Sequence, residues 1–145
     1  MSEDIKQAVQ KVFEKIWNQG DTSAADQIFA DTYVAHIASI SSPINSADEF
    51  KQFVALFRAL SPDMCFTIDD QVAEGDKVAT RWTVRFPSSS DGLVAESANE
   101  DIVVTGMSMH KMTNGKLVES WDNWDSMTAF QSMGQDVFES LSLNM

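Results

Sequence analysis

The hydrophobic period of this sequence changes once, near Met64, from a helical repeat to the alternation that is typical of β-strands. Beyond that point the alternating segments are Met64–Ala73, Lys77–Pro87, Asp101–Met112 and Lys116–Asp125. Short turns containing glycine separate the first pair and the last pair, and a longer polar connection, Ser88–Glu100, lies between the pairs. Helices followed by an antiparallel meander favour an α+β fold, with the helices packed on one face of a curved sheet.

Three helices are expected before the meander. The first spans residues 3–19 and carries an apolar stripe, the second is the short segment Thr22–Phe29, and the third begins at Ser46. Ser46-Ala-Asp-Glu49 matches a capping box, which fixes the start of the third helix. Thr32–Ile37 has strand character. A chain of 145 residues suits a single domain, 1–145, with one core.

The charge balance restricts the class of partner. Ten basic and 22 acidic residues give a net charge of −12, which repels phosphate backbones, so no nucleic-acid partner is expected. The N-terminal segment lacks the features of a signal peptide, and no apolar run has membrane-spanning length, so no membrane partner is expected. The single cysteine, Cys65, lies in an apolar run and is expected to be buried; with no disulfide possible within the chain, a cytoplasmic location is expected.

The segment Gly115–Asp125, GKLVESWDNWD, carries the strongest chemical signal. Alternation places Asp122 and Trp124 on one face of a strand, and Trp121 and Asn123 on the other. A carboxylate beside large apolar rings is poorly hydrated, so its pKa is expected to rise. General acid–base chemistry near neutral pH uses carboxylates whose pKa is raised in this way. The alternative is that both aspartates are solvated residues at the end of a strand. Asp125 is expected to cap a helix over Ser126–Met133.

Three stretches together resemble the SnoaL-like polyketide cyclase family. They are IWNQGDTSAADQIFADTYVAH, IDDQVAEGDKVATRWTVR and TGMSMHKMTNGKLVESWDNWD, in the order and at the spacing of that family. The resemblance implies the cone-shaped α+β barrel of the nuclear-transport-factor-2-like superfamily. It also implies chemistry without a metal or cofactor, in which an aspartate at the ESWD motif, here Asp122, is the general acid/base. Ser120 stands where the family often has a histidine.

The resemblance and the strand pattern together select eight candidate site residues. A histidine can polarise a carbonyl group, and a flat indole ring suits a flat substrate. The expected catalytic residues are Asp122, His36 and His110, and the expected substrate-binding residues are Trp82, Trp124, Ser108, Ser120 and Tyr33. For the histidines and tryptophans the alternative is a packing role. No close-spaced ligand pair such as H-x-x-x-H occurs, so no metal site is expected.

The turn around Asn114-Gly115 decides which residues share a face. A two-residue turn would set Met107 and Met109 across from Asp122 and Ser120, whereas a three-residue loop that includes Thr113 would pair Met112 with Lys116. The resemblance favours the three-residue loop. Ser108, His110, Ser120 and Asp122 would then line one wall of a cavity. The outward residues would be Met107, Met109, Leu117 and Trp121, an apolar surface that predicts a homodimer through the outer face of the sheet.

The expected function is cofactor-free acid/base chemistry on a small apolar carbonyl compound, by a cyclase-type aldol closure or an isomerisation. In this mechanism Asp122 moves a proton next to a carbonyl group, and His36 or His110 polarises that group. The alternative is a binding or accessory protein of the same fold, dimeric, which holds a hydrophobic ligand without changing it.

Overall fold

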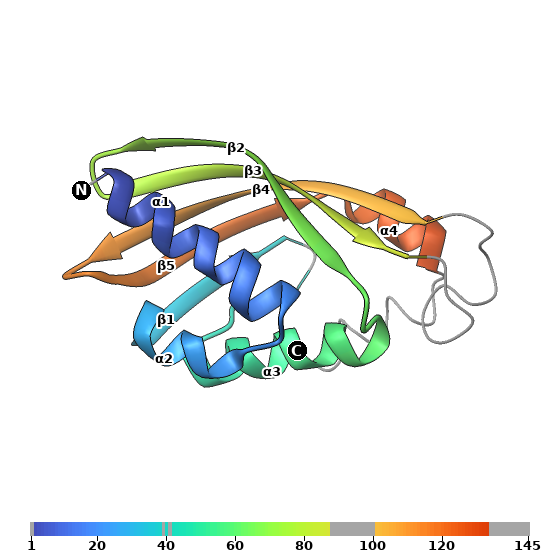
Figure 1. Ribbon diagram of the computed structural model, residues 1–145, viewed down its shortest axis with the longest axis horizontal. Helices are drawn as coiled ribbons and strands as arrows, with labels where there is room; N and C mark the ends of the chain where they lie inside the picture. Colours follow the sequence, from blue (N-terminus) through green and yellow to red (C-terminus); the bar gives the residue numbers. More distant parts are fainter. Residues whose placement is uncertain (1, 39, 41, 88–100, 134–145) are drawn as a thin grey trace.

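The computed structural model describes residues 2–38, 40, 42–87 and 101–133, so the predicted connection Ser88–Glu100 lies outside the described residues (Figure 1). In chain order the elements are α1 (Ser2–Lys11), the π-helix η1 (Val12–Asn18), the 3₁₀ turn η2 (Thr22–Ala24), α2 (Ala25–Ile28), β1 (Phe29–Ile37), α3 (Ala47–Leu60), β2 (Cys65–Glu74), β3 (Lys77–Phe86), β4 (Ile102–Thr113), β5 (Lys116–Trp124) and α4 (Ser126–Met133). The four strands of the predicted meander begin and end within one residue of their expected bounds.

The five strands form one sheet in the order β1-β5-β4-β3-β2. The pairs β2–β3, β3–β4 and β4–β5 are antiparallel, whereas the pair β1–β5 is parallel. The prediction of an antiparallel sheet is therefore wrong at this one pair. The chain leaves β1 through α3 and the other three strands, and it returns in the same direction beside β1. β1 and β2 are the two edges of the described sheet, which is open.

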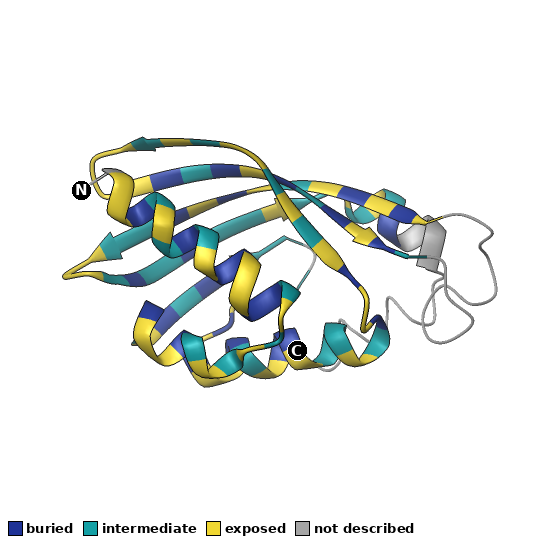
Figure 2. Ribbon diagram, in the orientation of Figure 1, coloured by how far each residue is buried: buried dark blue, intermediate teal, exposed yellow. Residues whose placement is uncertain are grey.

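The helices before β2 cover one face of this curved sheet (Figure 1). α1 packs on β2, β3 and β4, η1 packs on β2, and α3 packs on β1. The alternation along β3 shows which side is covered: Trp82 and Val84 are buried, whereas Arg81 and Arg85 point outward and are exposed (Figure 2). The core therefore lies between the inner face of the sheet and the helical layer.

Local sequence explains where α3 starts. The Ser46 hydroxyl accepts a hydrogen bond from the N–H of Glu49 at 3.1 Å, and the Glu49 carboxylate accepts one from the N–H of Asn45 at 3.2 Å. The first bond satisfies a donor that the helix start leaves free, as the capping box predicts, whereas the second goes to the residue before the N-cap instead of to Ser46 itself. Asp125 caps α4 in the same way: its carboxylate accepts hydrogen bonds from the N–H and the hydroxyl of Thr128.

In the β4–β5 hairpin, Ser108, His110, Ser120 and Asp122 share one face as expected, but the turn that connects the strands differs from the expected one. Its turn has two residues, Asn114 and Gly115, both with positive φ (52° and 79°), and the expected three-residue loop is wrong. Lys111 pairs with Glu119 but Met112 pairs with Leu117, so Val118 is an extra residue, a β-bulge.

Beyond the bulge the register is shifted by one residue. Ser108 consequently lies opposite Asp122, and His110 lies opposite Ser120. Leu117, on the turn side of the bulge, is fully buried, so its expected outward position is wrong. A one-residue shift exchanges the two faces of a strand, which explains both outcomes.

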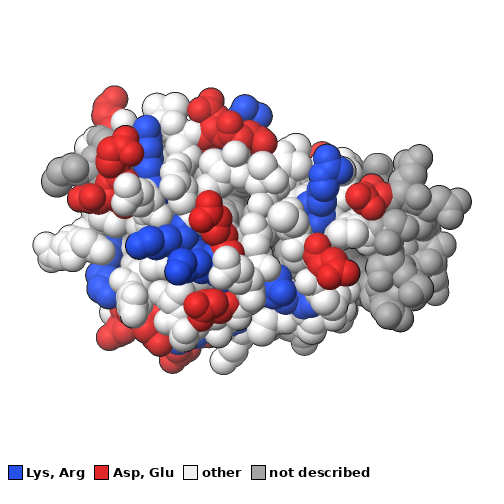
Figure 3. Space-filling view, viewed as in Figure 1, with Lys and Arg blue, Asp and Glu red and all other residues white. Residues whose placement is uncertain are grey.

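Cys65 begins β2 with its side chain exposed, so its expected burial is also wrong. On the face drawn in Figure 3, acidic and basic side chains are interspersed. Among the described helices, none combines the length and apolar character that crossing a membrane requires.

Candidate functional site

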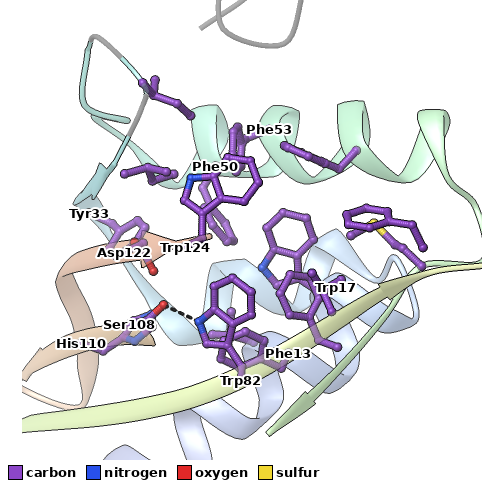
Figure 4. A pocket seen from close by; sticks show the side chains of 18 residues that line it. Phe13, Trp17, Tyr33, Phe50, Phe53, Trp82, Ser108, His110, Asp122 and Trp124 are labelled. Carbon is purple, nitrogen blue, oxygen red and sulfur yellow. Dashed lines mark hydrogen bonds between the residues drawn. The ribbon is translucent and has the colours of Figure 1, made fainter. Parts of the chain in front are cut away.

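A cavity of about 100 Å³ lies between the inner face of the sheet and the helices η1 and α3 (Figure 4). Most of its wall is aromatic. The phenylalanine and tryptophan side chains that line it are Phe13, Trp17, Phe50, Phe53, Phe57, Phe66, Trp82, Phe86 and Trp124. Such a concave, apolar site with few polar groups is the usual form of a small-molecule pocket.

The polar groups of the pocket gather on one wall. Ser108 and His110 come from β4, Asp122 from β5 and Tyr33 from β1, and Figure 4 shows these side chains together at one end of the aromatic cavity. The strand order explains this grouping, because β5 lies between β1 and β4. The sequence-based expectation that Ser108, His110 and Asp122 share a face corresponds to this geometry.

Tyr33, Ser120 and Asp122 form a hydrogen-bonded chain. The Ser120 hydroxyl donates to Asp122 Oδ2 at 2.9 Å, and the oxygen atoms of Ser120 and Tyr33 lie 2.6 Å apart. Because a serine hydroxyl has one hydrogen, which Ser120 gives to Asp122, the Tyr33 phenol is the donor in the other bond. Burial raises the pKa of Tyr33 well above 10, and the charge of Asp122 raises it further, against the opposing effect of the bond with Ser120. The phenol therefore keeps its proton at neutral pH.

Ser108 and Trp82 form a second buried pair. The indole Nε1–H of Trp82 donates to Ser108 Oγ at 2.9 Å (Figure 4). The indole ring lies over Gly106, where a Cβ would overlap Trp82 Cζ2 and crowd the carbonyl oxygen of Asn123. Glycine at this position of β4 therefore lets the tryptophan close one side of the pocket.

His110 is buried, with 3% of its surface exposed, and its ring borders the cavity. Burial lowers the pKa of His110, and the nearby charge of Asp122 opposes this effect in part. The imidazole is therefore neutral at pH 7. Its Nδ1 atom has no hydrogen-bond partner among the described residues, which is unusual for a buried polar atom.

His36 lies outside the pocket, so its expected catalytic position is wrong. It pairs with Trp121 across β1 and β5, on the outer face of the sheet. There its ring stacks on Trp121 with a centroid distance of 5.8 Å, and its Nε2 lies 2.7 Å from Glu119 Oε2. Alternation along β1 is the reason, since Tyr33 and Ala35 point inward and His36 points outward.

The other predicted binding residues take different positions. Trp82 and Trp124 both line the cavity, and the Trp124 indole donates to the carbonyl oxygen of Ala38 at 2.9 Å. Ser120 is fully buried beneath Asp122 and does not line the cavity. Within the described part of the chain, no three histidine, cysteine, aspartate or glutamate side chains are grouped closely enough to hold a metal ion.

The helical wall of the pocket was not among the residues expected to form the site. This wall is formed by aromatic side chains on the apolar faces of two helices: Phe13 and Trp17 from η1, and Phe50, Phe53 and Phe57 from α3. The signal that could have identified them is the concentration of aromatic rings on these two helical faces, because ligand pockets are lined mainly by hydrophobic and aromatic side chains.

The family and the solved structures that this chain resembles are consistent with its α+β fold. The sequence model of the SnoaL-like polyketide cyclase family matches residues 7–133, and the chain belongs to this family. A search of functionally curated proteins found no match.

Solved structures share the fold. A proposed polyketide cyclase from Acidithiobacillus ferrooxidans is 23% identical with a TM-score of 0.78, and the alignment covers 92% of this chain and 96% of that one. IdmH, a proposed polyketide cyclase from Streptomyces antibioticus, is 24% identical with a TM-score of 0.75, over 89% of this chain and 97% of IdmH. AclR, a proposed hydroxylase from Streptomyces galilaeus, is 20% identical with a TM-score of 0.75, over 93% of this chain and 98% of AclR. At these identities the likeness concerns the fold alone.

Proposed function

We propose that the protein is an enzyme that performs acid/base chemistry on a small apolar carbonyl compound, with Asp122 as the group that moves the proton. The observation that carries this proposal is the position of Asp122 at the polar end of an aromatic cavity. Ser120 holds Oδ2 of its carboxylate, which leaves Oδ1 for a substrate. A carboxylate that is fixed in this way beside a water-poor cavity suits proton transfer.

The chemistry balances without a further reactant. Asp122 removes a proton from the carbon next to a carbonyl group, and the electron pair of the broken C–H bond forms an enolate. In an aldol closure the enolate carbon attacks a second carbonyl group of the same molecule, and the resulting alkoxide takes the proton back from Asp122. In an isomerisation the proton returns to a different carbon. Both routes leave Asp122 ionised at the end of the cycle.

The size of the cavity limits the substrate. Its volume of about 100 Å³ is below the roughly 300–1,000 Å³ that is usual for drug-sized ligands. A compound with one small ring suits this volume best. A substrate with several rings would require the aromatic wall to move.

Exchange of α-hydrogens tests the proposal without knowledge of the natural substrate. Cyclopentanone in D₂O loses its α-hydrogen signal in proton NMR as deuterium replaces hydrogen. We expect the wild-type protein to accelerate this exchange and the Asp122→Asn variant to lose at least roughly a hundredfold of that acceleration, which is typical of the loss of a general base. Asp125→Asn is the matched control, because Asp125 caps α4 and does not line the cavity.

Two outcomes would contradict an enzymatic function of this kind. One is exchange by the wild-type protein no faster than by Asp122→Asn, and the other is equal loss of activity in Asp125→Asn. Firm binding of the ketone, with no exchange over a panel of one-ring ketones, would favour the alternative of a ligand-binding protein.

We also propose that the protein forms a homodimer through the outer face of the sheet. One row across this face consists of Val72, Ala79, Met109, Trp121 and His36, each paired with the next across neighbouring strands. Val72 is 67% exposed and Met109 is 41% exposed. Four of the five side chains in this row are apolar, and the row crosses all five strands, which supports an interface with a second copy.

A further inference from the structure

The hydrogen atom of the Ser108 hydroxyl has no acceptor among the described residues. Ser108 Oγ accepts the indole N–H of Trp82 at 2.9 Å, and no other hydrogen bond of Ser108 is found in the described part of the chain. A hydroxyl has one donor and two acceptor positions, so the bond from Trp82 leaves the Ser108 hydrogen available. Because Ser108 is buried at the edge of the cavity, that hydrogen can meet a ligand only from the cavity side.

His110 presents a second unsatisfied atom at the same place. It follows Ser108 by two residues on β4, so both side chains point to the same face of the sheet. Its buried Nδ1 lacks a partner among the described residues. In the tautomer that carries hydrogen on Nδ1, the neutral ring is a second donor beside the serine.

Leaving buried polar groups unpaired is unfavourable, and neighbouring groups left unpaired together indicate a missing partner. Asp122 restricts what that partner can be. It lies directly opposite Ser108 across β4 and β5, and its carboxylate repels an anionic ligand. An uncharged oxygen that accepts hydrogen bonds satisfies the donors without facing this repulsion.

We propose that Ser108, with His110 beside it, binds the carbonyl oxygen of an uncharged ketone whose remaining surface is apolar. This inference deepens the proposed function by assigning the two sides of the reacting group: the oxygen lies at β4, and the adjacent carbon faces Asp122 on β5. The same donors would hold the enolate oxygen more strongly, because hydrogen bonds to charged oxygen are stronger than those to neutral oxygen. Only the role of the adjacent carbon rests on the proposed function, since the binding of the oxygen does not require turnover.

Infrared spectroscopy of bound cyclopentanone tests the oxygen site directly. A hydrogen bond weakens the C=O bond, so the carbonyl stretch in the wild-type complex is expected at lower frequency than in hexane. In Ser108→Ala the stretch should move back toward the hexane value, and in Ser108→Thr, which retains a hydroxyl, it should remain shifted. Thr105→Ala is the matched control, because Thr105 is on the same strand but is exposed on the outer face.

A pair of ligands of similar shape gives the energetic measure. Methylenecyclopentane replaces the carbonyl oxygen of cyclopentanone by a CH₂ group. NMR titration measures the dissociation constants of both ligands. In Ser108→Ala the affinity for the ketone, relative to that for the hydrocarbon, should fall by about 2- to 10-fold, which is the loss expected for one hydrogen bond. The ratio should not change in Thr105→Ala.

The results separate this inference from the proposed function. A carbonyl stretch in the wild-type complex equal to that in hexane would overturn the oxygen site, whatever the variants do. An unchanged ligand ratio in a folded Ser108→Ala protein would also overturn it, even if Asp122-dependent exchange is observed. A shifted stretch that depends on Ser108, together with no exchange, would support the oxygen site and reject the acid/base function.

Discussion

The hydroxyl oxygens of Tyr33 and Ser120 lie 2.6 Å apart in the core, and the Ser120 hydroxyl donates a hydrogen bond to the carboxylate of Asp122. Tyr33 thus supports Asp122 through an intermediate serine, although the two residues come from β1 and β5. In a mostly apolar environment this chain gives the half-buried carboxylate a hydrogen bond from Ser120.

The first prediction concerns the titration of Tyr33, which is the sole tyrosine of the chain. Burial, and then the charge of Asp122, raise the pKa of Tyr33 well above 10. The Asp122→Asn substitution should lower this pKa toward the ordinary value without reaching it, because burial remains. Near-ultraviolet absorbance of tyrosinate measures the pKa directly. An identical titration curve in wild type and Asp122→Asn would show that the two groups are not coupled.

The same shift predicts a loss of stability in alkali. Above a pH of about 10 the unfolded chain releases the tyrosine proton while the folded protein retains it, so the free energy of unfolding falls as the pH rises. Tyr33→Phe should remove this part of the alkaline dependence. Urea unfolding between pH 8 and pH 11, chosen as values on either side of about 10, measures it.

The second prediction concerns Ser120. Replacing it with alanine leaves the phenol of Tyr33 and the carboxylate of Asp122 without their shared partner, and we expect a loss of about 1–3 kcal/mol in the free energy of unfolding. In the double variant Tyr33→Phe/Ser120→Ala the losses should be less than additive, with a coupling of about 0.5–3 kcal/mol. Urea unfolding of the four proteins provides the cycle. Strict additivity would mean that the short contact contributes no coupling.

The third prediction concerns acid stability and His110. Burial lowers the pKa of His110 in the folded protein, against about 6.5 in the unfolded chain. As the pH falls below about 6.5, the unfolded chain binds a proton that the folded protein does not, so the free energy of unfolding falls by up to about 1.4 kcal/mol per pH unit.

The chain contains its own control for this effect, since His36 is its other histidine and is exposed. His110→Gln should flatten the dependence of stability on pH between about 6.5 and 5, where unpaired carboxylates contribute little. His36→Gln should leave the contribution of His110 in place. An NMR titration should also show that the imidazole signal assigned to His110 changes at lower pH than an unburied histidine would. Equal acid dependence in wild type and His110→Gln would rule out this role.

The fourth prediction concerns the outer face. Met109→Glu should weaken the proposed homodimer by at least roughly tenfold, because burying an unpaired carboxylate in an interface costs more than about 1.4 kcal/mol. Met127 of α4 is 65% exposed and lies outside the row that crosses the sheet, so Met127→Glu is the control. Light scattering after gel filtration measures the mass. A wild-type protein that remains monomeric at high concentration would refute the interface.

Much of the fold could be predicted because local signals decide it. The alternation of β2 to β5, the capping box at Ser46 and the cap at Asp125 each depend on residues close in sequence. The parallel pairing of β1 with β5 could not be predicted in the same way. It joins segments separated by most of the chain, and its stability comes from packing that no local pattern records.

The candidate site was predicted in part for a similar reason. Ser108, His110 and Asp122 lie on regular strands, so alternation places them together once the register is known. His36 is three residues from Tyr33 on β1, so alternation lets only one of the two face the pocket, and the structure shows that this residue is Tyr33. The bond from Trp82 to Ser108, and the chain from Tyr33 to Asp122, depend on distances across strands that only the folded structure provides.

The extra residue at Val118 has a consequence for how this hairpin can change. If β4 and β5 paired regularly with Val118 retained, Lys111 would face Val118, and everything beyond it on β5 would exchange sides. Glu119 and Trp121 would then turn toward the helices, and Asp122 would turn to the surface. Deletion of Val118, by contrast, would keep every observed pair beyond the bulge, from Lys111 with Glu119 to Ser108 with Asp122, so Asp122 would still face the pocket. The bulge at Val118 therefore determines which alternate side chains of β5 face the interior of the protein.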